Sequence, residues 1–118
     1  MEAEGELWQE AAGDFKRVLA ERPGDTRAHQ HLGGVLFLWG DQFSKAGQFE
    51  QAIVRYREAL VYRASDAELH MSLGVALARA QRGAEAVSEF QAALRIDPNF
   101  QPARQALAQV QGTLAKQK

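Results

Sequence analysis

The side chains that could bind a metal or act in catalysis are few and lie apart in the sequence. His29 and His31 are separated by one residue, so their imidazoles point in different directions on a helix. His70 stands alone, and the chain has no cysteine whose thiolate could complete a metal site. We expect His29 and His31 to be exposed polar residues of a helix, and His70 to pack with its polar edge in water.

Other polar clusters have simpler structural explanations. Glu85 and Glu89 lie four residues apart, a spacing typical of the solvated face of a helix. The pair Gly33–Gly34 is not followed by the Lys-Ser/Thr of a phosphate-binding loop. Arginines and tyrosines alternate between residues 55 and 63, as in some nucleic-acid surfaces, but Glu58 dilutes their charge. The sequence therefore predicts no catalytic site, no cofactor and no metal, and the protein is not expected to be an enzyme.

The overall composition is that of an ordinary globular domain. The chain has 118 residues, of which 46% are hydrophobic, and its 14 basic and 15 acidic residues give a net charge of -1. This balance provides no strong field for nucleic acid or an acidic membrane surface. The first residues are acidic, unlike a signal peptide, and no apolar run reaches the ~18 residues of a membrane span. We expect a cytoplasmic protein, and a periplasmic or membrane-tethered fragment remains an alternative.

Apolar residues recur at spacings of three and four along nearly the whole chain, which predicts an all-α fold. Turn residues such as Pro23–Gly24 and Asp97–Pro98 divide the pattern. Asp25 or Thr26, and later Ser65 or Asp66, are candidate N-caps for the helices that follow them. Six helices are predicted, over about 4–22, 26–46, 49–62, 66–81, 84–96 and from 101 onward.

The stretch from residue 66 to 99 contains Leu73–Gly74 and Leu77, followed by Ala86, Phe90, Ala93–Leu94 and Pro98. This order and spacing resembles one tetratricopeptide repeat, a helix–turn–helix unit of ~34 residues. The resemblance implies a right-handed superhelix of antiparallel helix pairs, a solenoid that serves as a binding scaffold.

Aligned on that stretch, the chain 1–118 forms a single domain of about two and a half repeats plus a cap. Residues 1–25 are a half repeat, 26–65 a repeat with a seven-residue insertion, 66–99 a full repeat and 100–118 a capping helix. The alignment places Leu32–Gly33 opposite Leu73–Gly74. Seven residues are about two helical turns, or ~10 Å, so we predict one long helix from 26 to 46. The alternative is a helix that ends at Gly40–Asp41 and a loop to Gly47.

In this family the first helices of successive repeats line a concave groove that holds a peptide or a partner helix. The resemblance places a set of polar and apolar residues in this groove, namely Arg27, Gln30, His31, Gly34, Phe37, Leu38, Met71, Ser72, Val75, Ala78, Arg79, Gln105 and Gln109. A well-known variant of the family grips a carboxylate with Lys and Asn at four of these positions, where this chain has Gln30, Gly34, Met71 and Val75. We therefore expect a short amphipathic or apolar segment as the partner, with an acidic residue near Arg79.

A second surface is predicted on the first helix, which has no preceding helix to cover it in the alignment. Leu7, Trp8, Phe15 and Val18 would form an apolar face there, and such faces favour association. The leading hypothesis is a non-enzymatic scaffold that binds a protein or peptide, without nucleic acid or membrane insertion. The alternative is a homo-oligomeric assembly factor, for example a homodimer, that associates through this first-helix face.

Overall fold

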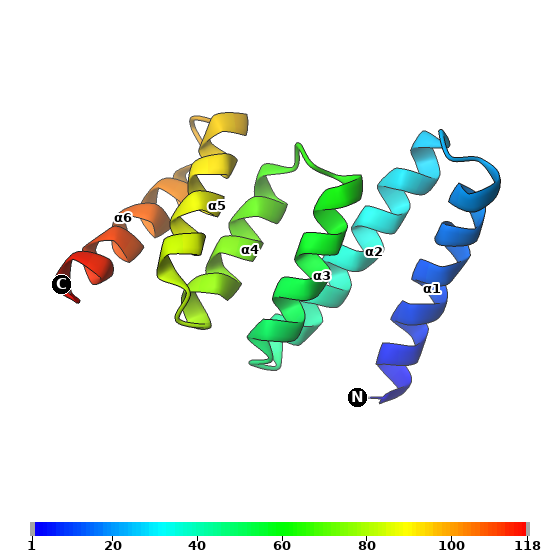
Figure 1. Ribbon diagram of the computed structural model, residues 1–118, viewed down its shortest axis with the longest axis horizontal. Helices are drawn as coiled ribbons and strands as arrows, with labels where there is room; N and C mark the ends of the chain where they lie inside the picture. The colour runs from blue at the N-terminus through cyan, green and yellow to red at the C-terminus, as the bar shows by residue number, and fades with distance from the viewer. Residues whose placement is uncertain (1, 118) are drawn as a thin grey trace.

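Six α-helices joined by short turns make up the computed structural model of the chain, which describes residues 2–117 and their side chains from residue 5 onward (Figure 1). The helices are α1 (Glu2–Glu21), α2 (Thr26–Lys45), α3 (Phe49–Tyr62), α4 (Ala67–Arg79), α5 (Gly83–Ile96) and α6 (Gln101–Lys116). The prediction of an all-α fold with six helices is confirmed. None of the described helices is long and apolar enough to cross a bilayer.

Consecutive helices run antiparallel and stack side by side along an axis of 50 Å, with α1 and α6 at opposite ends (Figure 1). The most extensive packing lies within two hairpins, α2 with α3 and α4 with α5. Helix α4 also contacts both α2 and α6, so the even-numbered helices form one row of the stack. The core between the rows is built from Leu, Ala and two aromatic rings, as expected for closely packed helices.

Aspartates cap two of the helices in the predicted positions. The side chain of Asp25 accepts a hydrogen bond from the backbone N–H of Ala28 at 3.0 Å, and Asp66 accepts one from Leu69 at 3.1 Å. Each carboxylate satisfies an N–H group that the first turn of its helix leaves without a partner. These two caps fix the points at which α2 and α4 begin.

The long helix predicted for residues 26–46 is confirmed, because α2 continues without a break to Lys45. Its last turns are held by side chains. Trp39 and Phe43 stack with ring centroids 6.1 Å apart, and the Trp8 indole donates a hydrogen bond of 2.5 Å to Gln42. Thus α1 supports the end of α2 through the hydrogen bond from Trp8.

An aromatic ring from the second helix lies on a glycine of the first helix in both hairpins. A Cβ added to Gly74 would come within 2.5 Å of the Phe90 ring, and one added to Gly40 within 2.7 Å of the Tyr56 ring. Both rings are about 1% exposed. Since Gly40 precedes Gly74 by 34 residues and Tyr56 precedes Phe90 by the same number, the two contacts repeat with the period of the fold.

This contact corrects the alignment of α2. The sequence placed Gly33 opposite Gly74, but Gly33 packs against the side chain of Arg63, and Gly40 holds the place under the ring. The two alignments differ by seven residues. The two extra turns of α2 therefore lie at its start, before the section that pairs with α3, rather than in its second half.

We predict that Gly40→Ala lowers the free energy of unfolding by up to about 2 kcal/mol. Alanine favours a helix over glycine by ~1 kcal/mol, but the added methyl group would displace the buried Tyr56 ring, and overpacking of this kind costs about 1–3 kcal/mol. Urea denaturation of the variant would measure the difference.

Gly13→Ala is the matched control, because nothing lies within 4 Å of a Cβ added to Gly13 in α1. This variant should be more stable than the parent by up to ~1 kcal/mol. If both variants changed stability in the same direction, the ring-on-glycine contact would not control the packing of the hairpin.

Candidate functional site: a groove along the even-numbered helices

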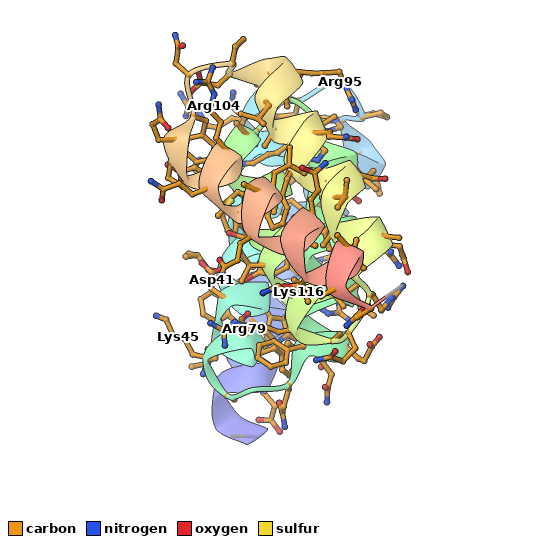
Figure 2. The ribbon with its side chains drawn as sticks, turned by 90° about the vertical axis from the view of Figure 1, so that its left-hand side faces the viewer. Asp41, Lys45, Arg79, Arg95, Arg104 and Lys116 are labelled. Atoms are coloured by element: carbon orange, nitrogen blue, oxygen red, sulfur yellow. The ribbon has the colours of Figure 1, made fainter. Side chains whose placement is uncertain are left out.

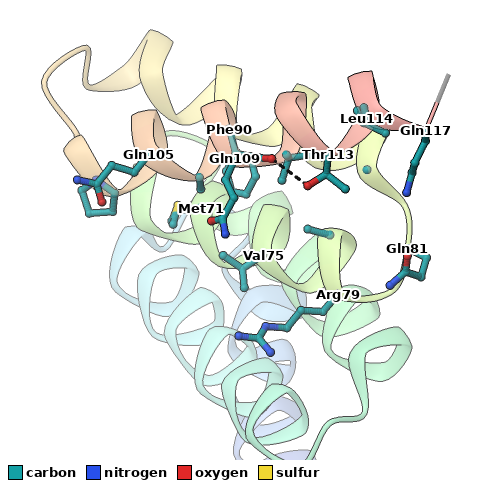
Figure 3. Close-up of a pocket in the computed structure, with 15 residues that line it drawn as sticks. Met71, Val75, Arg79, Gln81, Phe90, Gln105, Gln109, Thr113, Leu114 and Gln117 are labelled. Atoms are coloured by element: carbon teal, nitrogen blue, oxygen red, sulfur yellow. Dashed lines mark hydrogen bonds between the residues drawn. The ribbon is translucent and has the colours of Figure 1, made fainter.

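A cavity of about 590 Å³ opens between α4 and α6, with the Phe90 ring of α5 in its wall (Figure 3). Its apolar lining consists mainly of Met71, Val75, Ala78, Phe90, Pro102, Ala106, Val110 and Leu114. The side chains of Met71 and Val75 lie on α4 across from Gln109 and Thr113 on α6 (Figure 3). A volume of this size accommodates one or two large apolar side chains of a partner.

Polar groups surround the apolar lining. Gln105, Gln109 and Gln117 border the cavity on α6, and Arg79 borders it at the end of α4. The Arg79 guanidinium lies 5.8 Å from the centre of the Phe49 ring. Within the part of the chain that the structure describes, no carboxylate pairs with it. Arg79 is therefore a fixed and exposed positive charge next to an apolar hollow.

The structure brings together the predicted groove residues of α4 and α6. Met71, Val75, Arg79, Gln105 and Gln109 all line this one cavity. Ala78 also lines it, and Ser72 is half-buried on the same helix.

The predicted groove residues at the start of α2 lie elsewhere. Arg27 is exposed, and His31 stacks on the Phe15 ring of α1 with centroids 5.4 Å apart. Gln30 borders an open hollow beside residues 62–68, and its carbonyl oxygen accepts a hydrogen bond of 3.0 Å from Arg63. Gly34 lies against the same arginine. None of these four residues lines the cavity: His31 contacts α1, and Gln30 and Gly34 contact Arg63 at the end of α3.

Phe37 and Leu38 lie further along α2, in the section that pairs with α3. The Phe37 ring meets the Tyr56 ring edge to face, with centroids 5.9 Å apart. Leu38 is 55% exposed and lines a second hollow of about 600 Å³ with Trp8, Trp39 and Phe43. Phe37 is therefore partly engaged in packing, while Leu38 is available at the surface.

The ring-on-glycine contact also reveals groove positions that the sequence alignment missed. With Gly40 opposite Gly74, the residues of α2 that correspond to Val75, Ala78 and Arg79 are Asp41, Ser44 and Lys45. Asp41, Lys45 and Arg79 lie on the same side of the molecule (Figure 2). The equal spacing from Gly40 to Tyr56 and from Gly74 to Phe90 was the signal in the sequence that could have identified them.

Charge is distributed unevenly between the two rows of helices. Helices α2, α4 and α6 carry five basic and two acidic residues, whereas α1, α3 and α5 carry five basic and ten acidic residues. One of the two acids in the first row, Asp41, accepts a hydrogen bond of 2.5 Å from the Tyr56 hydroxyl. Burial, followed by this bond to Asp41, raises the pKa of Tyr56 far above its ordinary value, so its hydroxyl stays protonated and continues to donate.

One edge of the groove is basic. The last turns of α2, α4 and α6 contain Lys45, Arg79 and Lys116, respectively, and these three helices run in the same direction (Figures 1 and 2). The net charge of the whole chain, -1, hides this local excess of positive charge.

The densest charge network lies outside the groove, where Arg82 joins α3 to α5. Its guanidinium donates to both oxygens of Glu85 at 2.9 Å and to Glu50 at 2.9 Å, and Arg57 donates to Glu85 at 2.8 Å. The hydrogen bonds from Arg82, and then that from Arg57, lower the pKa of the Glu85 carboxyl, and the bond to Glu85 raises the pKa of Arg82. This network ties neighbouring hairpins together, and none of its four residues lines the cavity.

The four residues of the predicted first-helix face do not share one environment. Trp8 and Phe15 are half-buried, Trp8 bonded to Gln42 and Phe15 stacked on His31 of α2. Leu7 and Val18 are 65% and 37% exposed. The surface that α1 leaves open is therefore a narrower apolar stripe, beside the acidic residues of the same helix.

Among the described side chains, no three His, Cys, Asp or Glu residues gather in a way that could hold a metal ion. His70 instead bonds through Nδ1 to Glu89 at 2.8 Å and through Nε2 to the carbonyl oxygen of Ala64 at 2.9 Å. Both nitrogens are thus engaged in joining α4 to its neighbours.

A family model described as the tetratricopeptide repeat matches residues 37–99. These residues are more than half of the chain, and they include both ring-on-glycine contacts. No curated protein sequence matches the chain.

Solved structures of low sequence identity have the same fold. The first TPR of Spaghetti (RPAP3), bound to the HSP90 peptide SRMEEVD, is 17% identical, with a TM-score of 0.62 over 95% of this chain and 83% of that chain. The second TPR domain of human RPAP3, in complex with the HSP70 peptide SGPTIEEVD, is 16% identical, with a TM-score of 0.58 over 92% and 84%. MamA from AMB-1 is 21% identical, with a TM-score of 0.60 over 88% of this chain but only 53% of MamA.

The Arg82 network predicts how the Glu85 carboxyl titrates. Because its pKa is lowered in the folded chain, the pair's contribution to stability is complete above the ordinary glutamate pKa and is lost as the pH falls through the lowered value. Arg82→Gln should shift the Glu85 midpoint upward in a carboxyl-detected NMR titration.

Arg95→Gln, which changes an exposed arginine of α5 outside the network, should leave the Glu85 midpoint unchanged. An unaltered midpoint in the Arg82 variant would mean that the hydrogen bonds from Arg82 do not lower this pKa.

Proposed function

The chain belongs to the tetratricopeptide repeat family, and we propose that it is a non-enzymatic interaction module that holds a peptide or a partner helix along α2, α4 and α6. The primary contact in this proposal is the cavity between α4 and α6. The family is in general a protein-interaction fold, and two of the similar structures are described as peptide complexes of other proteins.

The observation that carries the proposal is the exposed apolar cavity itself. Met71 and Val75 on α4 face Val110 and Leu114 on α6 across a space that no side chain of the described chain fills. Apolar surface that remains exposed in a hollow favours a ligand, because filling it removes that surface from water at about 25 cal/mol per Å². Methionine in the lining can adapt to partners of different shape.

The charges around the cavity indicate which partner fits. Arg79 stands at the cavity rim, and Lys45 lies on the same side of the molecule (Figure 2). We propose a short segment that inserts an apolar side chain between α4 and α6 and places an acidic side chain near Arg79. In the corrected alignment, Phe37, Asp41, Met71 and Val75 occupy the positions where the carboxylate-gripping variant of the family has Lys and Asn. Other residues of this chain would therefore bind the acidic group of a partner.

The proposal is tested with peptides selected from a random library displayed on phage, with the purified chain as bait. The double variant Met71→Glu with Val75→Glu places two carboxylates in the cavity, beside apolar groups that a partner would cover. We expect it to weaken binding of the selected peptides at least tenfold, about 1.4 kcal/mol, as measured by fluorescence anisotropy.

Val61→Glu is the matched control, since Val61 on α3 is 73% exposed and lies outside every cavity described above. It makes the same chemical change and should leave peptide binding unaltered. Circular dichroism melting would establish that both variants fold. Equal affinity of the folded double variant and the parent would refute the groove, as would a library that yields no binding peptide.

A further inference from the structure

We propose that copies of this chain associate end to end, with α6 of one copy packing against α1 of the next as α4 packs against α5 within the chain. Within the described residues, α1 and α6 lie at opposite ends of the stack (Figure 1). The inference does not depend on the groove proposal, because it concerns the outer faces of α1 and α6.

Helix α1 lacks a neighbour on one face. Both α1 and α5 end just before a turn, at Glu21 and Ile96, and counting back from these ends pairs Ala11 with Ala86 and Val18 with Ala93. Ala86 and Ala93 are completely buried in the α4–α5 hairpin. Ala11 is only half-buried and Val18 is 37% exposed. The uncovered side of α1 is thus the side on which α5 is covered by α4.

Helix α6 lacks a neighbour on the complementary face. Counting from the first residues of α4 and α6 pairs Gly74 with Ala108, and Leu77 with Gln111. Gly74 and Leu77 are buried under α5, whereas Ala108 and Gln111 are exposed. Ala108 is small enough to let another helix approach, although less closely than Gly74 allows. Figure 2 views the molecule from the α6 end, with Arg104 labelled on this helix.

The same counting predicts an ion pair between copies. Within the chain, His70 of α4 bonds to Glu89 of α5 at 2.8 Å. Arg104 holds the position of His70 on α6, and Asp14 holds that of Glu89 on α1. Both are exposed. Among the described side chains, Asp14 pairs with Arg17 of its own helix, an exposed i,i+3 pair that contributes little stability.

The opposite net charges of α1 and α6 favour a second copy of the chain as the partner. Helix α1 contains six acidic and two basic residues, whereas α6 contains two basic residues and no acidic one. Because Gln111 replaces the buried Leu77, the α6 face is polar, and the contact therefore depends more on charge than an interior hairpin does. The association is expected to be reversible and to weaken as salt is added.

The geometry of the contact sets the form of the assembly. Different faces meet, α6 of one copy with α1 of the next, so each added copy leaves one free α1 face and one free α6 face. Such a heterologous contact builds open chains unless its rotation closes a ring. The mean mass in solution should therefore rise continuously with concentration instead of stopping at a dimer.

Sedimentation velocity at low ionic strength, from micromolar to millimolar protein, measures the association. The test compares the parent with variants in which the charge of one partner of the predicted ion pair is reversed. Asp14→Arg places two positive charges at each contact, and Arg104→Asp places two negative charges there. Each variant alone should associate at least about fivefold more weakly than the parent. An equimolar mixture of the two should recover the association, because Arg104 of one variant then meets Asp14 of the other.

Arg95→Asp is the control, since it makes the same charge change on an exposed residue of α5, outside the groove and outside the two end helices. It should associate as the parent does. A monomeric parent at millimolar concentration would overturn the proposal, and so would a mixture that stays as dissociated as its components. A further variant, Lys45→Asp, removes a positive charge beside the groove. If this variant lost association and Arg104→Asp kept it, the acidic α1 would bind in the groove of another copy. That result would also overturn the proposal.

Discussion

The close approach of helices within each hairpin depends on an aromatic ring that lies on a glycine. Phe90 on Gly74 and Tyr56 on Gly40 leave no room for a Cβ, so both positions require glycine at this helix separation. Buried rings and small residues together give the interior density that native cores require. Because the contact recurs after 34 residues, it also sets the repeat from which the stack is built.

The proposed binding surface follows from this packing. Stacked hairpins place the even-numbered helices in one row, and the last turns of these helices bring Lys45, Arg79 and Lys116 to one edge of that row. The same stacking leaves a cavity where α6 diverges from α4, into which Met71 and Val75 project (Figure 3). A chain of nearly neutral net charge thus has one row of helices with an excess of positive charge and another with an excess of negative charge.

Much of the fold could be predicted from the sequence because its determinants are local. Helix periodicity and the caps at Asp25 and Asp66 indicate where the helices lie, and the observed bounds of α3 are the predicted ones. The groove on α2 was predicted less well. Leu32–Gly33 and Trp39–Gly40 stand seven residues apart and face nearly the same way, so helix periodicity alone does not distinguish them. The equal spacing from Gly40 to Tyr56 and from Gly74 to Phe90 does, and the packing of the two rings shows why that spacing matters. The cavity depends on how α6 packs against α4 and α5, which local patterns do not encode.

The central claim, that partners bind between α4 and α6, is tested most directly by NMR of the isotope-labelled chain as a selected peptide is added. The account predicts that the largest shift changes occur in the amide and methyl signals of Met71, Val75 and Val110, with smaller changes at Arg79 and Lys45. The largest changes on α3 or on the outer face of α5, with Val75 and Val110 unmoved, would contradict it.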